Sequence, residues 1–211
     1  ISFSPVRKRQ TSVWKEVMEG LKYAATTSVI RTLIISIGVV SIFGISFVTL
    51  LPAWAVNILD GDATTNGFLQ SARGLGALIS ALTIASVGRF KFKGKLFTIG
   101  FVVFPALLGI FTFSRWFPFS LVLIFAVGGS QILTMNLANA LVQTHLPDNL
   151  KGRVMAVYTL TFFGCMPIGA ILIGSLADQF GEPTAIFITA AATLLVSIAV
   201  MLFMPYIKKL E

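Results

Sequence analysis

Charged residues are scarce in this sequence of 211 residues. They make up 11% of the chain, against about 25% in typical soluble domains, while 56% of the residues are hydrophobic. The mean hydropathy of +0.90 leaves too few polar side chains to cover the surface of a soluble globule. The composition therefore excludes a soluble domain and predicts an integral membrane protein.

Residues that catalyse reactions or bind metals are also few. The chain has one cysteine, Cys165, and one histidine, His145, and none of its acidic residues lies inside a long apolar run. The sequence therefore offers no embedded Ser/His pair, no paired carboxylates and no His/Cys/Glu cluster for an active site or a metal site. A phosphate-binding loop of the Walker type is also missing. We expect no enzymatic activity and no cofactor.

The lack of embedded carboxylates also bears on energy coupling. A proton-driven transporter needs a titratable group within the membrane, and His145 stands at the end of an apolar run, where a helix-end role is favoured. If protons drive this protein, the coupling carboxylate therefore lies outside this chain. The acidic residues all fall in predicted loops or near the chain ends: Glu16, Glu19, Asp60, Asp62, Asp148, Asp178, Glu182 and Glu211.

What the sequence does have is a series of long apolar runs. Each is long enough to cross a hydrocarbon core of about 30 Å as a helix. The sequence therefore predicts an all-α membrane protein whose residues 31–211 form one domain of six transmembrane helices. The predicted spans are residues 32–57, 65–88, 96–114, 119–142, 154–177 and 184–206.

The basic residues lie on one side of this threading. Four of them fall in residues 89–95, between the second and third spans, and all of the 16 except Arg73 and Arg115 belong to segments on that same side. Lys and Arg in short loops mark the cytoplasmic side of a membrane. We therefore expect both chain ends in the cytoplasm. The net charge of +8 reports this topology and membrane lipid contact, and does not indicate a nucleic-acid partner.

Residues 1–30 are predicted to form a cytoplasmic linker. The first ten residues are basic and polar, and from Thr11 apolar side chains recur at helical spacing opposite charged ones. We expect an amphipathic helix on the inner membrane face, with a solvent-exposed linker helix as the alternative. The chain begins with Ile1 and shows no signal peptide, which suggests a piece of a longer polypeptide.

The second span carries the clearest candidate site residue, Arg73. A cation near the centre of a membrane helix costs roughly 2.5–3.5 kcal/mol on insertion scales, so such residues usually have a function. Gln70, Ala77 and Ser80 share its helix face, which predicts a polar stripe along a cavity. An anion would suit Arg73 as a ligand. The alternative is that Arg73 extends to the outer headgroups or pairs with Asp60 or Asp62.

The fourth span carries a second polar face. Asn136, Asn139 and Gln143 recur at helical spacing, with Gln131 and Thr134 nearby. Such side chains either bind a substrate or hydrogen-bond to neighbouring helices. We treat Gln70, Arg73 and these three residues as candidate substrate-binding residues.

Small residues mark places where helices are expected to pack closely. They include Gly74, Gly76 and Ser80 in the second span and Gly164, Gly169 and Gly174 in the fifth. Pro167 lacks a backbone donor and allows the fifth helix to bend.

Several stretches resemble a known family. Residues 51–77, with RGLGA at 73–77, are similar to the seventh and eighth helices of major facilitator superfamily transporters. LPDNLKGRVMA at 146–156, Pro167-x-Gly169 and GSLADQFG at 174–181 extend the resemblance over nearly the whole chain. Together they look like the drug exporter branch of enterobactin exporters and macrolide efflux proteins, also called transmembrane secretion effectors.

The resemblance implies the C-terminal half of a twelve-helix transporter, built as two inverted three-helix repeats. It implies a secondary transporter of the bacterial inner membrane that exports small organic molecules such as drugs or siderophores by alternating access, driven by protons. Its partner is the N-terminal six-helix half. The spacing of Gly164, Pro167 and Gly169 is similar to an antiporter motif of exporters. The residues expected to act in gating or helix packing are Gly88, Arg89, Lys91, Lys95, Gly152, Arg153, Gly164, Pro167, Gly169 and Asp178.

Two other functions stay open. A lipid or lysolipid translocator of the same fold would show an acyl-sized lateral opening lined by phenylalanines. A membrane scaffold that transports nothing would need no polar cavity and would pack Asn136 and Asn139 against neighbouring helices.

Overall fold

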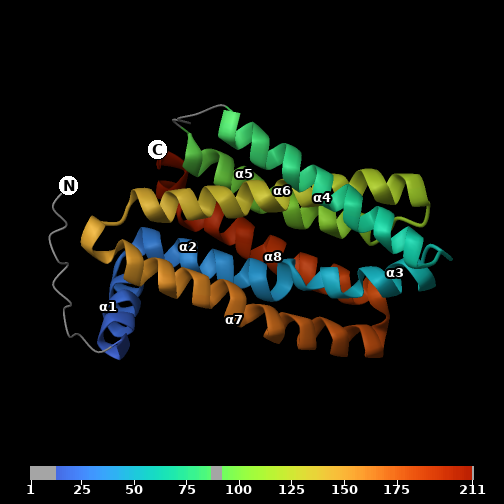
Figure 1. Ribbon diagram of the computed structural model, residues 1–211, viewed down its shortest axis with the longest axis horizontal. Helices are drawn as coiled ribbons and strands as arrows, with labels where there is room; N and C mark the ends of the chain where they lie inside the picture. Colours follow the sequence, from blue (N-terminus) through green and yellow to red (C-terminus); the bar gives the residue numbers. More distant parts are fainter. Residues whose placement is uncertain (1–12, 87–91, 211) are drawn as a thin grey trace, which may run out of the picture.

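A computed structural model of the chain describes residues 13–86 and 92–210, and all of the regular structure in these ranges is helical (Figure 1). Six helical segments are long and apolar enough to cross a membrane, which confirms the predicted fold class. Their bounds are Ser28–Asn57, Ala63–Ser86 (α4), Lys93–Phe111 (α5), Phe117–Thr144 (α6), Asp148–Phe180 (α7) and Glu182–Phe203 (α8).

The helix α7 begins earlier than the sequence indicated. We predicted a loop over residues 145–153, but α7 starts at Asp148, so the prediction is wrong for residues 148–153. Pro147 has the extended backbone of a helix N-cap, and Asp148 forms an ion pair with Lys151 in the first turn. The polar first turns therefore belong to the helix and carry it beyond its apolar part.

The first membrane span is not a single regular helix, which the sequence did not predict. It consists of α2 (Ser28–Val39), the π-helix η1 (Val40–Gly44), the 3-10 helix η2 (Ser46–Leu50) and α3 (Leu51–Asn57). The hydroxyl of Ser46 bonds to the carbonyl oxygen of Ile42, and Pro52 stands in the first turn of α3. Irregular backbone at membrane depth is tolerated where protein or a cavity surrounds it.

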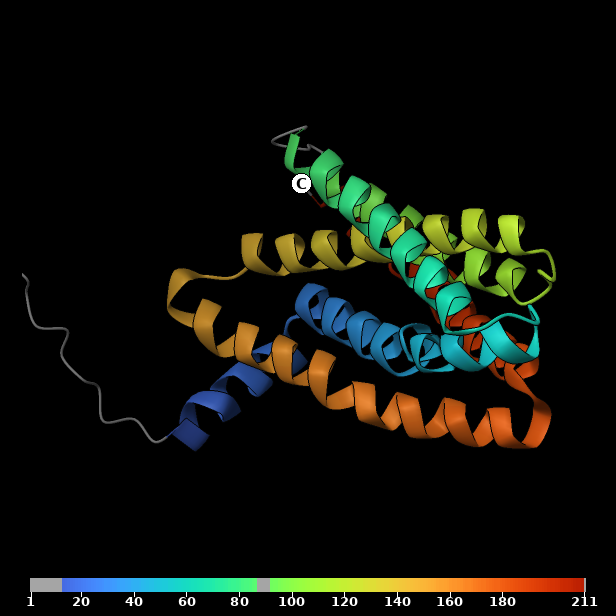
Figure 2. The same cartoon turned by 45° about the vertical axis from the view of Figure 1, so that its right-hand side comes forward.

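The six spans pack as two groups of three. α6 packs along α4 and α5, while the first span packs along α7 and α8, and α5 contacts α8 between the groups (Figures 1 and 2). If each of the first three spans is matched in order with one of the last three, the first span corresponds to α6 and α4 corresponds to α7. The contact between α4 and α6 then corresponds to the contact between α7 and the first span. Such an exchange is the pattern of two inverted three-helix repeats.

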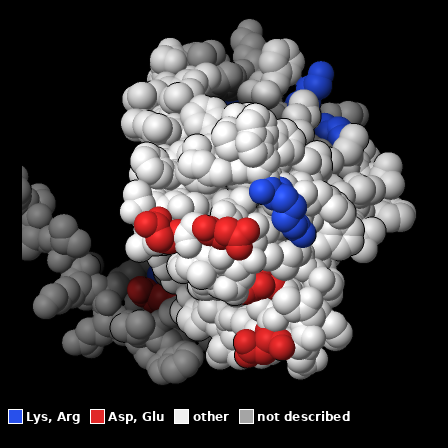
Figure 3. Space-filling model, turned by 90° about the vertical axis from the view of Figure 1, so that its right-hand side faces the viewer, with Lys and Arg blue, Asp and Glu red and all other residues white. Residues whose placement is uncertain are grey.

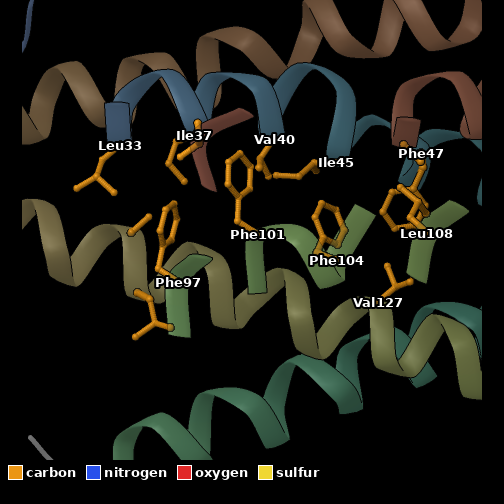
Figure 4. Close-up of a cluster of buried hydrophobic side chains, with 14 of the residues drawn as sticks. Leu33, Ile37, Val40, Ile45, Phe47, Phe97, Phe101, Phe104, Leu108 and Val127 are labelled. Atoms are coloured by element: carbon orange, nitrogen blue, oxygen red, sulfur yellow. The ribbon is translucent and has the colours of Figure 1, made fainter. Parts of the chain in front are cut away.

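The core lies between the first span and α5. Leu33, Ile37 and Val40 face a row of phenylalanines from α5 that includes Phe97 and Phe101, and all five side chains are buried (Figure 4). α4 and α7 contribute little to this core, since most of their residues are exposed or half-buried. These two helices therefore form the outer faces of the bundle.

Glycines allow the closest helix contacts. A Cβ atom at Gly76 would collide with the backbone carbonyl of Phe125 in α6, and one at Gly169 would collide with the backbone of Ile42 in η1. The structure therefore places both glycines in close helix contacts, as expected. Gly74 and Gly174 face open space, and Gly164 meets only a side chain of its own helix at ordinary distance, so the prediction of close packing is wrong for these three positions within the described residues.

The amphipathic N-terminal segment forms helix α1 (Val13–Thr26), which packs against the start of α7. Gly20 allows the contact, because a Cβ atom there would lie 2.7 Å from the carbonyl oxygen of Arg153. The apolar side chains of Met18 and Leu21 stay exposed. They remain available to a membrane surface, and the placement of α1 on that surface stays a prediction.

Candidate functional site

Arg73 lies near the middle of α4. By the helical rise of 1.5 Å per residue it stands about 15 Å from the first residue of that helix. Its guanidinium is directed to α6, where Gln131 is also at mid-helix and buried. The charged group of Arg73 therefore lies near the middle of α4 and α6, away from the ends of both helices.

The hydrogen-bond partners of Arg73 are neutral amides. Its Nε donates to Oε1 of Gln70 at 3.3 Å, and its Nη1 donates to Oε1 of Gln131 at 3.5 Å. The close approach of Gly128 fixes this geometry, because a Cβ atom on Gly128 would collide with the carbonyl oxygen of Arg73. The structure thus brings Gln70 and Arg73 together, as predicted from their spacing.

Gln131 was not among the candidate residues that the sequence analysis selected. Its signal was a single amide in the middle of an apolar run, and helical spacing within one helix did not connect it with Arg73. The contact depends on how α4 crosses α6 at Gly76 and Gly128, which is tertiary information.

No ion pair among the described residues involves Arg73. Asp62, one of the acidic partners considered, instead caps the start of α4. Its Oδ1 accepts hydrogen bonds from the backbone N–H groups of Thr64 at 2.9 Å and Thr65 at 3.0 Å. These bonds, the one from Thr65 first, lower the pKa of the Asp62 carboxyl below its usual value.

A cavity of about 340 Å³ adjoins Arg73. It lies where the irregular part of the first span meets α4 and α7. The lining residues are Ser41, Ile45, Ser46, Val48, Thr49, Arg73, Met166, Pro167 and Ala170. A half-buried cation on a mostly apolar wall can bind a ligand that has both a polar group and an apolar part.

The hydroxyl groups of this cavity all donate to backbone carbonyls. Ser41 donates to Phe162 at 2.5 Å, Thr49 donates to Ser46 at 2.7 Å, and Ser46 donates to Ile42. Their oxygen lone pairs remain as acceptors. The cavity therefore combines donors on Arg73 with acceptors on the first span.

The three polar residues of α6 lie in a different place. Asn136, Asn139 and Gln143 line an open groove of about 490 Å³ together with Ala81, Ile84, Ala85, Ala140 and Thr144. The amide of Gln143 donates to Asn139, and the hydroxyl of Tyr158 from α7 donates to the backbone carbonyl of Met135 at 3.5 Å. The structure thus brings these three together, but on a surface separate from the Arg73 cavity.

Arg153 joins α1 to α7 at the predicted inner boundary. It pairs with Glu19 and, at 3.5 Å, with Glu16. Gly152 and Asn149 line a space of about 360 Å³ between the two helices. Nearby, the hydrogen bond from Lys151 at 2.7 Å lowers the pKa of the Asp148 carboxyl.

The other predicted gating residues are scattered. Pro167 lines the Arg73 cavity, Lys95 lines a surface pocket beside Lys208, and Asp178 is exposed near the end of α7. Gly88, Arg89 and Lys91 lie outside the described residues. The assigned roles of all of these residues stay predictions.

The sequence profile of the transmembrane secretion effectors, a family of major facilitator transporters, matches residues 5–210. The chain belongs to this family. The resemblance drawn from the sequence motifs is thereby confirmed, and the chain is a multi-pass membrane protein of the efflux transporter type.

A curated relative is similar over most of this chain. It is the multidrug efflux pump Tap of Mycolicibacterium fortuitum, 26% identical over 196 residues, which are 92% of this chain and 47% of that protein. The chain spans about half the length of the relative it matches. Members of the family are thus transporters, in agreement with the expectation that the chain is not an enzyme.

Proposed function

We propose that the chain forms the C-terminal half of an exporter of small organic molecules such as drugs or siderophores. The observation that carries this proposal is the cavity at Arg73, which adjoins the middle of α4 and the irregular backbone of the first span. In secondary transporters the substrate site lies near the membrane midplane, between two halves that rock against each other. Arg73, Gln70 and Gln131 contact the substrate on this half.

The exposed faces of α4 and α7 support the need for a second half. Phe68, Leu75 and Leu82 on α4, and Leu160 and Ile171 on α7, are more than half exposed. A second six-helix half would cover these faces and close the cavity from the other side. The chain's length, about half that of its relative, supports the same arrangement.

The distribution of charge supports a proton-coupling group in the other half. Within residues 13–86 and 92–210, acidic side chains lie on α1, in the turn before α4 and at the ends of α7 and α8, and the middle of each span has none. The carboxylate that titrates during transport is therefore supplied by the partner half.

Charge also supports a bacterial inner membrane topology with both chain ends in the cytoplasm. The end of the molecule that carries the turn before α4 and the start of α8 displays a group of acidic residues (Figure 3). Asp60, Asp62, Asp178 and Glu182 belong to this end. The opposite end, with α1 and Lys151, is richer in basic residues, as expected of the cytoplasmic side.

The cavity gives less support to a lipid translocator. Among the described residues that line it, none is a phenylalanine, although such a path was expected to use these side chains. A scaffold that transports nothing would need no polar cavity, so the cavity at Arg73 favours a transporter over this alternative. We therefore favour export of a small molecule.

Efflux from cells that produce the complete transporter tests the proposal. We would measure efflux of dyes, macrolides and catecholate siderophores, with and without an uncoupler that collapses the proton gradient. Arg73→Ala and Asn139→Ala would be compared with the parent protein at matched membrane levels. We expect energy-dependent efflux of at least one compound class and a strong loss with Arg73→Ala.

Each other outcome changes the proposal in a defined way. Unchanged efflux with Arg73→Ala would move the substrate site out of this cavity, and a loss with Asn139→Ala alone would move it to the groove on α6. Efflux of none of the compounds, together with movement of a fluorescent lysolipid, would favour the lipid translocator.

A further inference from the structure

We infer that the Arg73 cavity selects organic anions, with Arg73 binding the acidic group of the substrate. This inference rests on the proposed function and adds the chemical class of the substrate. It depends on three features of the structure, which are the charge balance around Arg73, its depth and the composition of the cavity wall.

The charge balance is the first feature. Arg73 is half-buried and has two hydrogen-bond partners among the described residues, both of them amide oxygens without charge. A guanidinium carries five N–H donors, so Arg73, which lines the cavity, keeps donors that Gln70 and Gln131 do not engage. A cation in a setting of low polarity attracts an anion far more strongly than it would in water.

The depth of Arg73 is the second feature. Asp62 is one of the two acids that the sequence offered as partners of Arg73. Its carboxylate instead accepts hydrogen bonds from the backbone N–H groups of Thr64 and Thr65. Arg73 itself bonds to Gln131 at the middle of α6, away from both ends of that helix. Lipid phosphates reside at the membrane surfaces, about 15 Å from the centre of the hydrocarbon core. A transported ligand, rather than a resident lipid headgroup, therefore reaches this cation.

The cavity wall is the third feature and defines the rest of the ligand. Ser41, Ser46 and Thr49 present oxygen lone pairs, because their hydroxyl hydrogens are engaged with backbone carbonyls. These oxygens accept hydrogen bonds from hydroxyl or amine groups of a ligand. Most of the remaining wall is apolar, including Met166 and Pro167. The preferred substrate is an apolar molecule with an acidic group and a hydrogen-bond donor.

A pair of probes of nearly the same shape, one anionic and one neutral, tests the inference. The probes are 7-diethylaminocoumarin-3-carboxylate and the corresponding carboxamide, whose uptake is measured in inverted membrane vesicles that contain the complete transporter. Arg73→Gln removes the charge with a side chain of similar length, and Arg73→Lys retains it. Lys22→Gln, on the exposed face of α1, removes a positive charge outside the spans as the control.

We expect Arg73→Gln to slow transport of the carboxylate about tenfold or more while it changes transport of the carboxamide by less than about twofold, because charged hydrogen bonds are the stronger ones. Arg73→Lys should retain a preference for the carboxylate, and Lys22→Gln should transport both probes as the parent does. Membrane levels and the gel-filtration profile of each variant, measured in parallel, separate loss of transport from loss of folding.

The opposing outcomes are distinct. An equal loss of both probes with Arg73→Gln would overturn the anion inference and leave the exporter proposal standing. Unchanged transport of the carboxylate would overturn it as well. If the parent protein moves neither coumarin but moves fluorescent lysophosphatidylglycerol in a manner dependent on Arg73, the anion is a lipid and the small-molecule exporter proposal fails.

Discussion

Two arginines of this chain stand in opposite circumstances. Arg153, near the start of α7, pairs with two glutamates of α1, while Arg73, in the middle of α4, bonds to two neutral glutamines. Arg153 stands close to the predicted membrane surface, where water already reduces the cost of a charge. Arg73 lies at the depth where a charge costs most. Arg153 thus has counter-charges at a position where a charge costs little, whereas Arg73 has none at a position where a charge costs more.

This contrast separates a structural charge from a functional one. An ion pair such as the one of Arg153 holds two helices together and has no requirement for a ligand. We propose that Arg73, which has no counter-charge among the described residues, binds an anionic ligand that enters and leaves the cavity. The following predictions test the contrast from the largest expected effect to the smallest.

The first prediction concerns the backbone contact that positions Arg73. Gly128→Ala adds a Cβ atom against the carbonyl oxygen of Arg73, where backbone leaves no room. We expect a loss of about 1–3 kcal/mol in stability and a matching fall in the thermal midpoint of the purified transporter. Gly109→Ala, which faces open space on α5, outside the faces assigned to the second half, is the control. Equal midpoints for both variants would show that α4 does not cross α6 as described.

The second prediction concerns the ion pairs that Arg153 forms with Glu16 and Glu19. Reversing its charge in Arg153→Glu should release α1 from α7, and the double variant Glu19→Arg with Arg153→Glu should restore the contact. The expected loss of stability is below about 1 kcal/mol, because both glutamates are substantially exposed.

Maleimide labelling measures this release. Val17 lines the space between α1 and α7, so a cysteine there, in a background with Cys165→Ala, should react faster in Arg153→Glu than in the parent. Labelling that stays fast in the double variant would argue that charge pairing does not hold α1.

The third prediction concerns Asp62, the acid once considered as a partner of Arg73. Its depressed pKa means that it stabilises the folded state above the carboxyl's usual pKa, and this contribution disappears as the pH falls through the lowered value. Asp62→Asn should therefore lower the thermal midpoint slightly at neutral pH and leave it unchanged at pH values below the lowered pKa. Transport of anionic probes should stay normal. A loss of transport as severe as with Arg73→Gln would instead pair Asp62 with Arg73.

Much of this arrangement could be predicted from the sequence. Long apolar runs bounded by charged turns specify membrane helices because burial in lipid depends on length and hydropathy, which are local properties. The special status of Arg73 followed for the same reason, since a single cation within an apolar run is costly wherever the helix packs.

The remaining features depend on contacts between distant residues. The partnership of Arg73 with Gln131 arises from the crossing of α4 and α6, and the ion pairs of Arg153 join helices more than a hundred residues apart. The π- and 3-10 turns of the first span have no pattern of their own, because its apolar sequence suits a regular helix equally well. Hydropathy also predicted that the fifth span begins at residue 154, where the apolar residues begin. The helix itself begins earlier, at Asp148, and its first turns are polar.

The most direct test is to give Arg73 the counter-charge that Arg153 already has. Gln131→Glu places a carboxylate where an amide oxygen now lies 3.5 Å from Nη1 of Arg73, with almost no change in shape. Binding of 7-diethylaminocoumarin-3-carboxylate to the purified complete transporter would be followed by fluorescence anisotropy. Gln179→Glu, at the exposed end of α7, adds the same charge elsewhere. We predict that Gln131→Glu weakens binding about tenfold or more while Gln179→Glu does not. Unchanged binding in Gln131→Glu would contradict the account, because the charge of Arg73 would then have no part in holding the ligand.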